Sequence, residues 1–325
     1  MHKATASLIG ALLLTAWAVP ALAKDPLKLG YSDWPAWTVL KIANQKGWFA
    51  EAGVDVQLVW FDYSASLDAY SAGKIDGDCL IQSDALVLEA SGTKSKFVCI
   101  TDYSSGNDMI IGKKGVRSLA DLKGQKVALE VGLDEHYLLV HGLEAKGLNP
   151  ADVPVVNTST DNLLQVLASG EVGGVGAWYP VSGQILKSVP GATKLYSTAD
   201  APGLIWDVIA ASPTSFASRR DDWAKVAQVY FRCVAYLQDP ATAKDAIAIM
   251  SAKVGVSPEE YVKNLAGTRF LTLPEAKAAL IKGNGLMSLY DSMVAADKFN
   301  LENNVYKTSQ NPDDCIVRSM FDRLK

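Results

Sequence analysis

Stretches with the spacing of a β-strand alternate with stretches that have the spacing of a helix, from Leu27 onward. The segment "LKLGYS" is short and apolar, residues 37–51 ("WTVLKIANQKGWFAE") carry apolar side chains at helical spacing, and "VDVQLVWF" is rich in β-branched residues. A helix at residues 64–72, a strand at "IDGDCLI" and a helix at "ALVLEASG" continue the series. Strands separated by helices need crossover connections, so this order predicts an α/β fold with mixed, mostly parallel sheets and flanking helices.

The pattern repeats and then changes character. Strands at "KFVCITDYS" and "DMIIGKK" are followed by a second strand-and-helix series, and from Trp223 onward only helical patterns remain. A chain of 325 residues is longer than a usual single domain, so two lobes are expected. The predicted division is residues 24–112 and 212–325 in lobe I and residues 113–211 in lobe II, with crossings near Gly112–Lys113 and Ala211–Ser212.

The first 23 residues have the layout of a secretory signal peptide. A mostly apolar run from Leu8 to Val19 is followed by Pro20 and a small-x-small triplet that ends at Ala23. The run is shorter than the roughly 20 apolar residues of a membrane helix, and no later stretch approaches that length. We therefore expect cleavage before Lys24 and an exported, soluble protein; a buried N-terminal helix is the alternative.

Charge and cysteine content exclude several classes of partner. The formal net charge is −4 and the chain has no block of basic residues, which argues against a nucleic acid as partner. Four cysteines, Cys79, Cys99, Cys233 and Cys315, are too widely spaced for a zinc site. An exported protein can form disulfides, but cysteine is also a common buried apolar residue, and the spacing selects no pairing.

The order of motifs resembles a known family. The segments "LKLGYSDWPAW", "ANQKGWFAEAGVDVQLVWF", "AYSAGKIDGDCLIQSDAL", "IIGKKGVRSLADLKGQKVALEVG" and "VLASGEVGGVGAWYP" follow one another as in the solute-binding proteins of ABC importers for nitrate, taurine and alkanesulfonates. Within it, "GYSDWPAW" and "GNDMII" are most similar to a branch associated with urea- or guanidine-degrading enzymes. The resemblance implies a two-lobed periplasmic clamp with a two-strand hinge, a small-molecule solute and a permease in the inner membrane. It implies no cofactor and no metal ion, and we expect a monomer.

Polar and aromatic side chains gather after the predicted strands, where open α/β sheets bind their ligands. The candidate ligand-binding residues are Asp33, Trp34, Trp37, Gln82, Ser83, Asp84, Asn107, Asp108, Glu130, Asp134, Glu135, His136, Trp178 and Tyr179. Six of them are carboxylates and none is a lysine or arginine, so an anion is not expected. Asp134 and Glu135, however, also suit the ordinary capping of a helix start.

The aromatic candidates fit a cation as well. Trp34, Trp37, Trp178 and Tyr179 could stack on a flat cation, although each could equally be a core residue. A planar guanidinium matches carboxylates through paired N–H donors. Asp33 is expected to supply the counter-charge and Trp34 the π-face, with Asp108 and Glu130 as further acceptors. Neutral urea and a sulfonate or taurine-type solute are the alternatives.

Catalysis and structural roles are the other classes considered. His136 and His141 lack a nucleophile motif, and "VGLDEH" does not have the spacing of the H-E-x-x-H zinc motif. We therefore expect no catalytic residues. The family also resembles thiamine-pyrimidine biosynthesis proteins, which do react, and paired carboxylates such as Asp134 and Glu135 could in principle transfer protons. A structural or adhesive protein should show repeats or exposed apolar patches, and the sequence shows neither.

Overall fold

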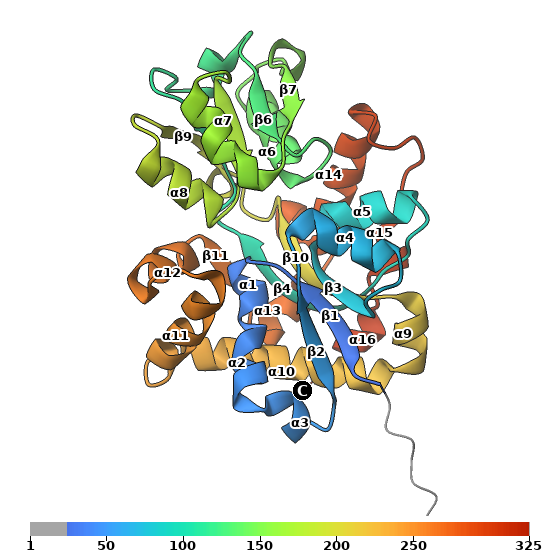
Figure 1. The fold of residues 1–325 in the computed structure, drawn as a ribbon. Helices are drawn as coiled ribbons and strands as arrows, with labels where there is room; N and C mark the ends of the chain where they lie inside the picture. The colour runs from blue at the N-terminus through green and yellow to red at the C-terminus, as the bar shows by residue number, and fades with distance from the viewer. Residues whose placement is uncertain (1–24, 325) are drawn as a thin grey trace, which may run out of the picture.

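The computed structural model describes residues 25–324 of the 325-residue chain. It consists of two α/β lobes, one above the other in Figure 1, each built around its own sheet. The predicted signal peptide and its cleavage site lie outside the described residues. Within residues 25–324, no helix is long and apolar enough to cross a membrane.

Lobe I contains a six-stranded sheet with the strand order β11-β4-β10-β3-β1-β2. Its central strands, β3 and β10, are buried along their whole length. The strands are β1 (Leu27–Tyr31), β2 (Val56–Trp60), β3 (Gly77–Ile81), β4 (Lys96–Ser104), β10 (Trp206–Ala211) and β11 (Thr268–Phe270). Strand β1 runs parallel to β2 and β3, whereas β10 is antiparallel to β3 and β4.

Lobe II contains a five-stranded sheet with the order β7-β6-β8-β5-β9. Its strands are β5 (Met109–Gly112), β6 (Val127–Leu129), β7 (Val155–Asn157), β8 (Gly174–Ala177) and β9 (Thr193–Ser197). Strand β6 is parallel to β7 and β8, and β5 is antiparallel to β8 and β9. Two mixed sheets with flanking helices confirm the predicted fold class. The sheets are less parallel than predicted because β5 and β10, the first strand after each crossing, run against their neighbours.

The chain passes between the lobes twice. It leaves lobe I after Ser104, enters the second sheet at Met109, and returns between Ser197 and Trp206. These crossings lie a few residues before the predicted ones near Gly112–Lys113 and Ala211–Ser212. Because Asp108 and Asp207 lie next to them, both carboxyl groups are carried to the junction of the lobes.

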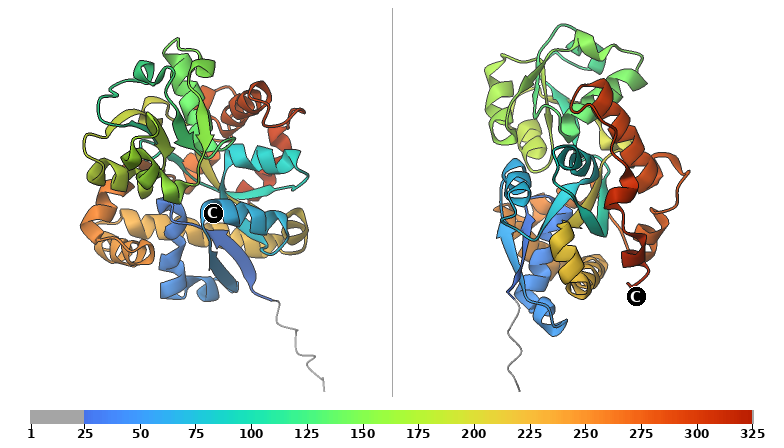
Figure 2. Two further views of the ribbon diagram at one scale, coloured as in Figure 1. Left: turned by 45° about the horizontal axis from the view of Figure 1, so that its top comes forward. Right: turned by 90° about the vertical axis from the view of Figure 1, so that its right-hand side faces the viewer.

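Helices cover both sheets, and most of them belong to lobe I (Figures 1 and 2). The helices of lobe I are α1 (Pro35–Thr38), α2 (Leu40–Lys46), α3 (Trp48–Glu51), α4 (Tyr63–Ser71), α5 (Gln82–Ala90), α9 (Pro213–Ser218), α10 (Arg220–Gln238), α11 (Ala243–Val254), α12 (Pro258–Leu265), α13 (Leu273–Ala278), α14 (Leu289–Glu302), α15 (Pro312–Cys315) and α16 (Arg318–Phe321). The helices of lobe II are α6 (Asp134–Ala145), α7 (Leu163–Ser169) and α8 (Val181–Ser188). Apolar side chains form one core cluster that centres on the first sheet and reaches α6, and a smaller one around β8 and α7.

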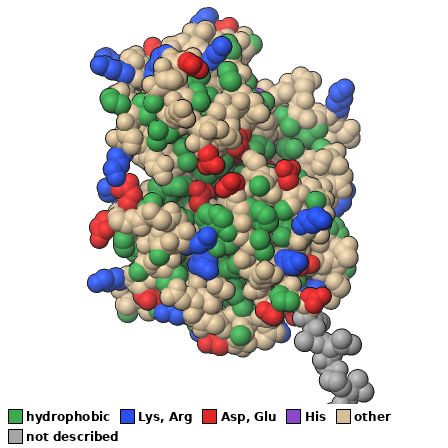
Figure 3. Space-filling view, in the orientation of Figure 1, with side chains coloured by type: hydrophobic (Ala, Val, Ile, Leu, Met, Phe, Trp, Pro, Cys, Tyr) green, Lys and Arg blue, Asp and Glu red, His purple; other side chains and the backbone are tan. Residues whose placement is uncertain are grey.

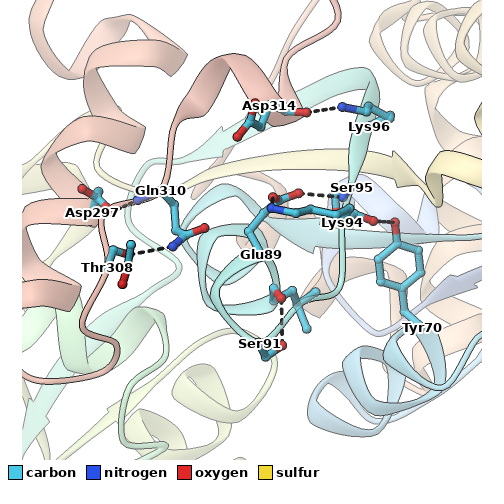
Figure 4. Close-up of polar contacts among 11 residues, drawn as sticks. Tyr70, Glu89, Ser91, Lys94, Ser95, Lys96, Asp297, Thr308, Gln310 and Asp314 are labelled. Carbon is cyan, nitrogen blue, oxygen red and sulfur yellow. Dashed lines mark hydrogen bonds and ion pairs between the residues drawn. The ribbon is translucent and has the colours of Figure 1, made fainter.

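The C-terminal segment folds back on lobe I and is hydrogen-bonded to β4 and α14, and the outer end of α5 is held by the loop that follows it. Lys96 Nζ donates a hydrogen bond to the carbonyl of Asp314, and the Gln310 N–H donates to Asp297 Oδ1 at 2.8 Å (Figure 4). Buried Glu89 of α5 accepts from the Ser95 N–H at 2.9 Å and from Lys94 at 2.5 Å. The four cysteines are buried and free.

Candidate functional site

A small cavity lies where the two lobes meet. Its volume is about 10 Å³, close to the roughly 10–15 Å³ that a single water molecule needs. Lobe I, lobe II and the crossing segments all contribute to its wall. The lining residues are Trp34, Trp37, Tyr63, Ile81, Asp108, Asp134, Trp178, Ile205 and Asp207.

Three carboxyl groups line this cavity and are called here the inner carboxyl groups: Asp108, Asp134 and Asp207. All three are buried, with 2% of Asp108, 0% of Asp134 and 1% of Asp207 exposed. No hydrogen-bond donor reaches Asp108 Oδ2, Asp207 Oδ2 or either oxygen of Asp134. Buried polar atoms are normally paired, and here the acids interact mainly with one another, Asp108 with Asp134, Asp134 with Glu135 and Asp207 with Asp102. Their remaining oxygens are free to accept hydrogen bonds.

A fourth acid, Glu135, stands beside the inner carboxyl groups. One oxygen from each of Asp108, Asp134 and Glu135 lies within 4.8 Å of the others, a spacing at which one small cation could contact all three. On the face of the molecule seen in Figure 3, acidic side chains gather in the middle, where the two lobes meet.

Helix α6 directs Asp134 and Glu135 into the junction. The N-cap position is taken by Leu133, and both acids are buried in the first turn. No donor reaches either carboxyl group, so neither side chain caps the helix. Gly176 of β8 permits this packing, because a Cβ added there would lie 2.8 Å from Glu135 Cβ. The capping alternative for this pair is therefore not what the structure shows.

The acids are costly to ionise in the absence of a cation. Burial is the main cause that raises the pKa of Asp108 to about 6. Burial, followed by the charge of neighbouring acids, raises the pKa of Asp134, Glu135 and Asp207 well above the usual range. No lysine or arginine is among the main groups that act on these four acids within residues 25–324. A bound cation would supply the missing positive charge.

Besides Ile81 and Ile205, four aromatic side chains line the cavity and are called here the aromatic wall: Trp34, Trp37, Tyr63 and Trp178. Trp37 stacks on Tyr63 with ring centroids 5.3 Å apart, and Trp178 meets Tyr63 edge-on at 5.9 Å. Trp34 lies 6.4 Å from Trp37. Electron-rich rings facing unpaired carboxylates suit an organic cation, which gains from both.

A second, outer space adjoins the cavity. It is a groove of about 330 Å³ whose wall includes Asp33, Glu130 and Asp161, and Tyr63 and Trp178 line both spaces. Glu130 links the lobes there, because it accepts hydrogen bonds from Ser64 Oγ at 2.9 Å and from the Thr160 N–H at 3.1 Å. Asp33 is half-buried and interacts with Trp178 across the lobe junction.

The structure brings only some of the predicted binding residues together. Trp34, Trp37, Asp108, Asp134 and Trp178 line the cavity, and Glu135 and Asp84 stand directly behind its wall. Asp33 and Glu130 belong to the outer groove instead. Asp33, the predicted counter-ion, lines the outer groove, and the inner carboxyl groups line the cavity.

The remaining predicted residues have structural contacts away from the cavity wall. Gln82 donates to the Leu204 carbonyl and accepts from the Trp206 N–H, and Asn107 donates to the Asn264 carbonyl and to Thr268 Oγ1. His136 packs against Phe299 of α14, with ring centroids 5.4 Å apart. Ser83 and Tyr179 are buried without lining the cavity.

Sequence reasoning missed four cavity residues: Tyr63, Ile81, Ile205 and Asp207. Tyr63 is the first residue of α4, directly after the loop that follows β2. Asp207 is an acid inside the apolar run of β10, as Asp102 is inside β4. A carboxylate within an otherwise buried strand was the available signal, because such groups are rarely buried without a partner.

Comparison with known proteins places the chain in a family. The NMT1/THI5-like family matches residues 34–243. The chain belongs to this family. A Brucella abortus (strain 2308) protein that is named as a binding protein is 30% identical over 232 residues, which cover 70% of each chain. The predicted resemblance is thereby confirmed at the level of the family, while the urea- or guanidine-associated branch stays a prediction.

Solved structures share the fold. The periplasmic aliphatic sulphonate binding protein of Escherichia coli superposes with a TM-score of 0.75 at 17% identity, covering 93% of this chain and 100% of that one. The desulfurization enzyme DszB superposes with a TM-score of 0.64 at 15% identity, covering 92% of this chain and 98% of that one. At these identities the likeness concerns the fold alone.

Proposed function

We propose that this chain is the periplasmic solute-binding component of an ABC importer and that it captures a small, nitrogen-rich organic cation such as guanidinium. The observation that carries the proposal is the cavity in which three buried carboxyl groups, with no cation among the lining residues, face an aromatic wall. Membership of the NMT1/THI5-like family and the two-lobed fold support the role of a solute-binding protein. The predicted signal peptide and a permease in the inner membrane belong to this proposal.

The charge of the site determines the sign of the solute. A sulfonate or nitrate would enter a cavity whose charged groups are Asp108, Asp134 and Asp207, with no cation in the cavity wall to receive it. The start of α6, which could otherwise attract an anion through its dipole, carries Asp134 and Glu135 in its first turn. An anionic solute would therefore be repelled by these carboxyl groups in their ionised form, and Trp37 Nε1–H is the unpaired donor that the same wall offers.

The shape of the site favours an organic cation over a metal ion. A metal ion such as Ca²⁺ prefers oxygen ligands on all sides, whereas much of this wall is indole, phenol and aliphatic carbon. A planar guanidinium can donate paired N–H bonds to Asp108 and Asp134 while its face meets an aromatic ring. Neutral urea offers fewer N–H donors and no charge, so it is the second candidate.

Two lobes that enclose the solute are part of the proposal. The two segments that cross between the sheets, residues 105–108 and 198–205, form the hinge. Ser64 of lobe I and Glu130 of lobe II already bond across the junction. The alternative is an enzyme that carries out a thiamine-pyrimidine type of reaction. An enzyme would convert the bound solute into a product, whereas a binding protein would release it unchanged.

A thermal-shift screen of the purified mature protein tests the proposal. The panel is guanidinium, methylguanidinium, urea, choline, taurine, nitrate and Ca²⁺, because a ligand that binds the folded state raises apparent stability by mass action. We expect guanidinium to raise the melting temperature at the lowest concentration. A shift with taurine or nitrate and none with guanidinium would contradict the proposal, and product formation in the same samples would support the enzyme alternative.

A further inference from the structure

The aromatic wall limits the size of whatever the cavity encloses. The volume of about 10 Å³ leaves space for little more than a water molecule, so the lobes must separate slightly even for guanidinium. Three of the four aromatic side chains come from lobe I, and Trp178 comes from lobe II. If these rings could turn freely, a small movement of one indole would admit a much larger solute. Their positions therefore decide which cations fit.

Three of the rings are held by carboxyl groups that do not line the cavity. The Trp34 Nε1–H donates to Asp102 Oδ2 at 2.9 Å, and the Tyr63 hydroxyl donates to Asp84 Oδ2 at 2.6 Å. Trp178 interacts with Asp33. These acids, Asp33, Asp84 and Asp102, are called here the outer carboxyl groups. They come from the loop after β1, from α5 and from β4, so three separate elements fix the wall.

Tyr63 has the greatest influence among these rings. Its oxygen is bound on two sides, since it donates to Asp84 and accepts from the Ile81 N–H at 3.1 Å. Trp37 has a buried Nε1 without a partner, so ring contacts orient it: it stacks on Tyr63 at 5.3 Å and meets Trp34 at 6.4 Å. Trp178 meets the edge of Tyr63 from the other lobe. The bond from Tyr63 to Asp84 therefore orients three of the four rings.

We infer that the outer carboxyl groups are positioning residues which lock the aromatic wall and restrict the site to guanidinium and similarly small, unsubstituted planar cations. This inference rests on the proposed function and narrows its class of solute. Arginine-like cations carry the same guanidinium group, and polyamines carry ammonium groups, but the alkyl chains of both have no space between the locked rings. The inner carboxyl groups supply attraction, and the outer ones supply selectivity.

An electrostatic role for the outer carboxyl groups predicts something different. If Asp84 acted only by its negative charge, its removal would weaken the binding of all cations by the same factor and leave their relative affinities unchanged. A positional role changes the ratio between a small and a substituted cation. Tyr63→Phe separates the two roles, because it removes the hydroxyl and the bond to Asp84 but leaves every carboxylate in place.

The test is calorimetric titration of guanidinium, N,N-dimethylguanidinium and agmatine into wild type, Tyr63→Phe, Asp84→Asn and Asp84→Ala. One additional methylene group in a tight pocket typically costs about 10-fold or more in affinity, so wild type should prefer guanidinium over dimethylguanidinium by at least that factor. Tyr63→Phe and Asp84→Ala should reduce this preference several-fold. Asp84→Asn keeps an oxygen that accepts a hydrogen bond from Tyr63. It should preserve the preference for guanidinium over dimethylguanidinium while weakening the binding of all three cations by a similar factor.

The outcomes separate the inference from the proposed function. An unchanged preference in Tyr63→Phe, or equal binding of agmatine and guanidinium by wild type, overturns the inference and leaves guanidinium binding intact. Absence of binding of all three cations to wild type overturns the proposed function, and the inference with it. Circular dichroism and thermal melts check folding. If Asp84→Ala does not fold, Tyr63→Phe still decides the question.

Discussion

Binding of guanidinium should release protons, so its affinity should depend on pH. Burial raises the pKa of Asp108 to about 6, and Asp134 is raised further by burial and by its neighbours. Below pH 6 the free site holds a proton on Asp108, and a cation must displace it. One pKa unit corresponds to about 1.36 kcal/mol, so each pH unit below 6 should weaken the binding of guanidinium about tenfold. Between pH 8 and pH 5 the affinity should thus fall at least about tenfold.

The stability of the free protein should change with pH in the opposite direction to the affinity for guanidinium. An acid whose pKa is raised by folding stabilises the folded state at low pH, and this contribution is lost as the pH rises through about 6 for Asp108. The melting temperature of the free protein should therefore decrease from pH 4 to pH 7 as far as this group is concerned. The increase in melting temperature on adding guanidinium should grow over the same range.

Calorimetry in two buffers with different ionisation enthalpies measures the released protons directly. Asp108→Asn should reduce the number of protons released, whereas Asp68→Asn, at an exposed position of α4, should leave it unchanged. Urea carries no charge and should bind without proton release. Equal guanidinium affinity at pH 5 and pH 8, with heats that do not depend on the buffer, would refute this reasoning.

Further predictions follow from the same geometry. Asp108→Asn should weaken the binding free energy of guanidinium by about 2–5 kcal/mol, since it removes a buried charge partner. The binding free energy of urea, measured by the same calorimetry, should change much less. Asp33→Asn, at the outer groove, should cost guanidinium less than Asp108→Asn; the reverse order would return the counter-ion role to Asp33. Glu135→Gln should raise the melting temperature of the free protein more at pH 8 than at pH 5, because burial and Asp134 raise the pKa of Glu135. In solution the lobes of the solute-free protein should be further apart than in this structure, so small-angle scattering should show a smaller radius of gyration with guanidinium than without it. An unchanged profile at saturation would count against closure.

The alternation of strand and helix patterns was sufficient to predict the fold class. The breaks between helices and the positions of the crossings depend on tertiary contacts that the spacing of apolar residues in the sequence does not show. Residues 37–51 read as one helix but form α1, α2 and α3, and Gly47 with φ 72° stands between the last two. Both predicted crossings lie a few residues too late, because Met109–Gly112 pairs with β8 and β9 in the second sheet and Trp206–Ala211 pairs with β3 and β4 in the first.

The site was predicted where the chain itself brings residues together. Asp134 and Glu135 follow a strand and start a helix, and Trp34 and Trp37 share one turn, so adjacency in sequence was enough. His136 was grouped with them, but two residues along a helix the side chain faces a different direction and packs on α14. Asp207 and Tyr63 reach the cavity only through the return of the chain and the closure of the lobes. For Asp207 the available local signal is a carboxylate inside an apolar strand, and Tyr63 has no such signal.

The most direct test of the central claim is a pair of calorimetric titrations of the mature protein at pH 8 and matched ionic strength, one with guanidinium chloride and one with taurine. The account predicts saturable 1:1 binding of guanidinium and no measurable heat of binding with taurine, because the charged groups in the cavity wall are Asp108, Asp134 and Asp207. Saturable binding of taurine, with none of guanidinium, would contradict it.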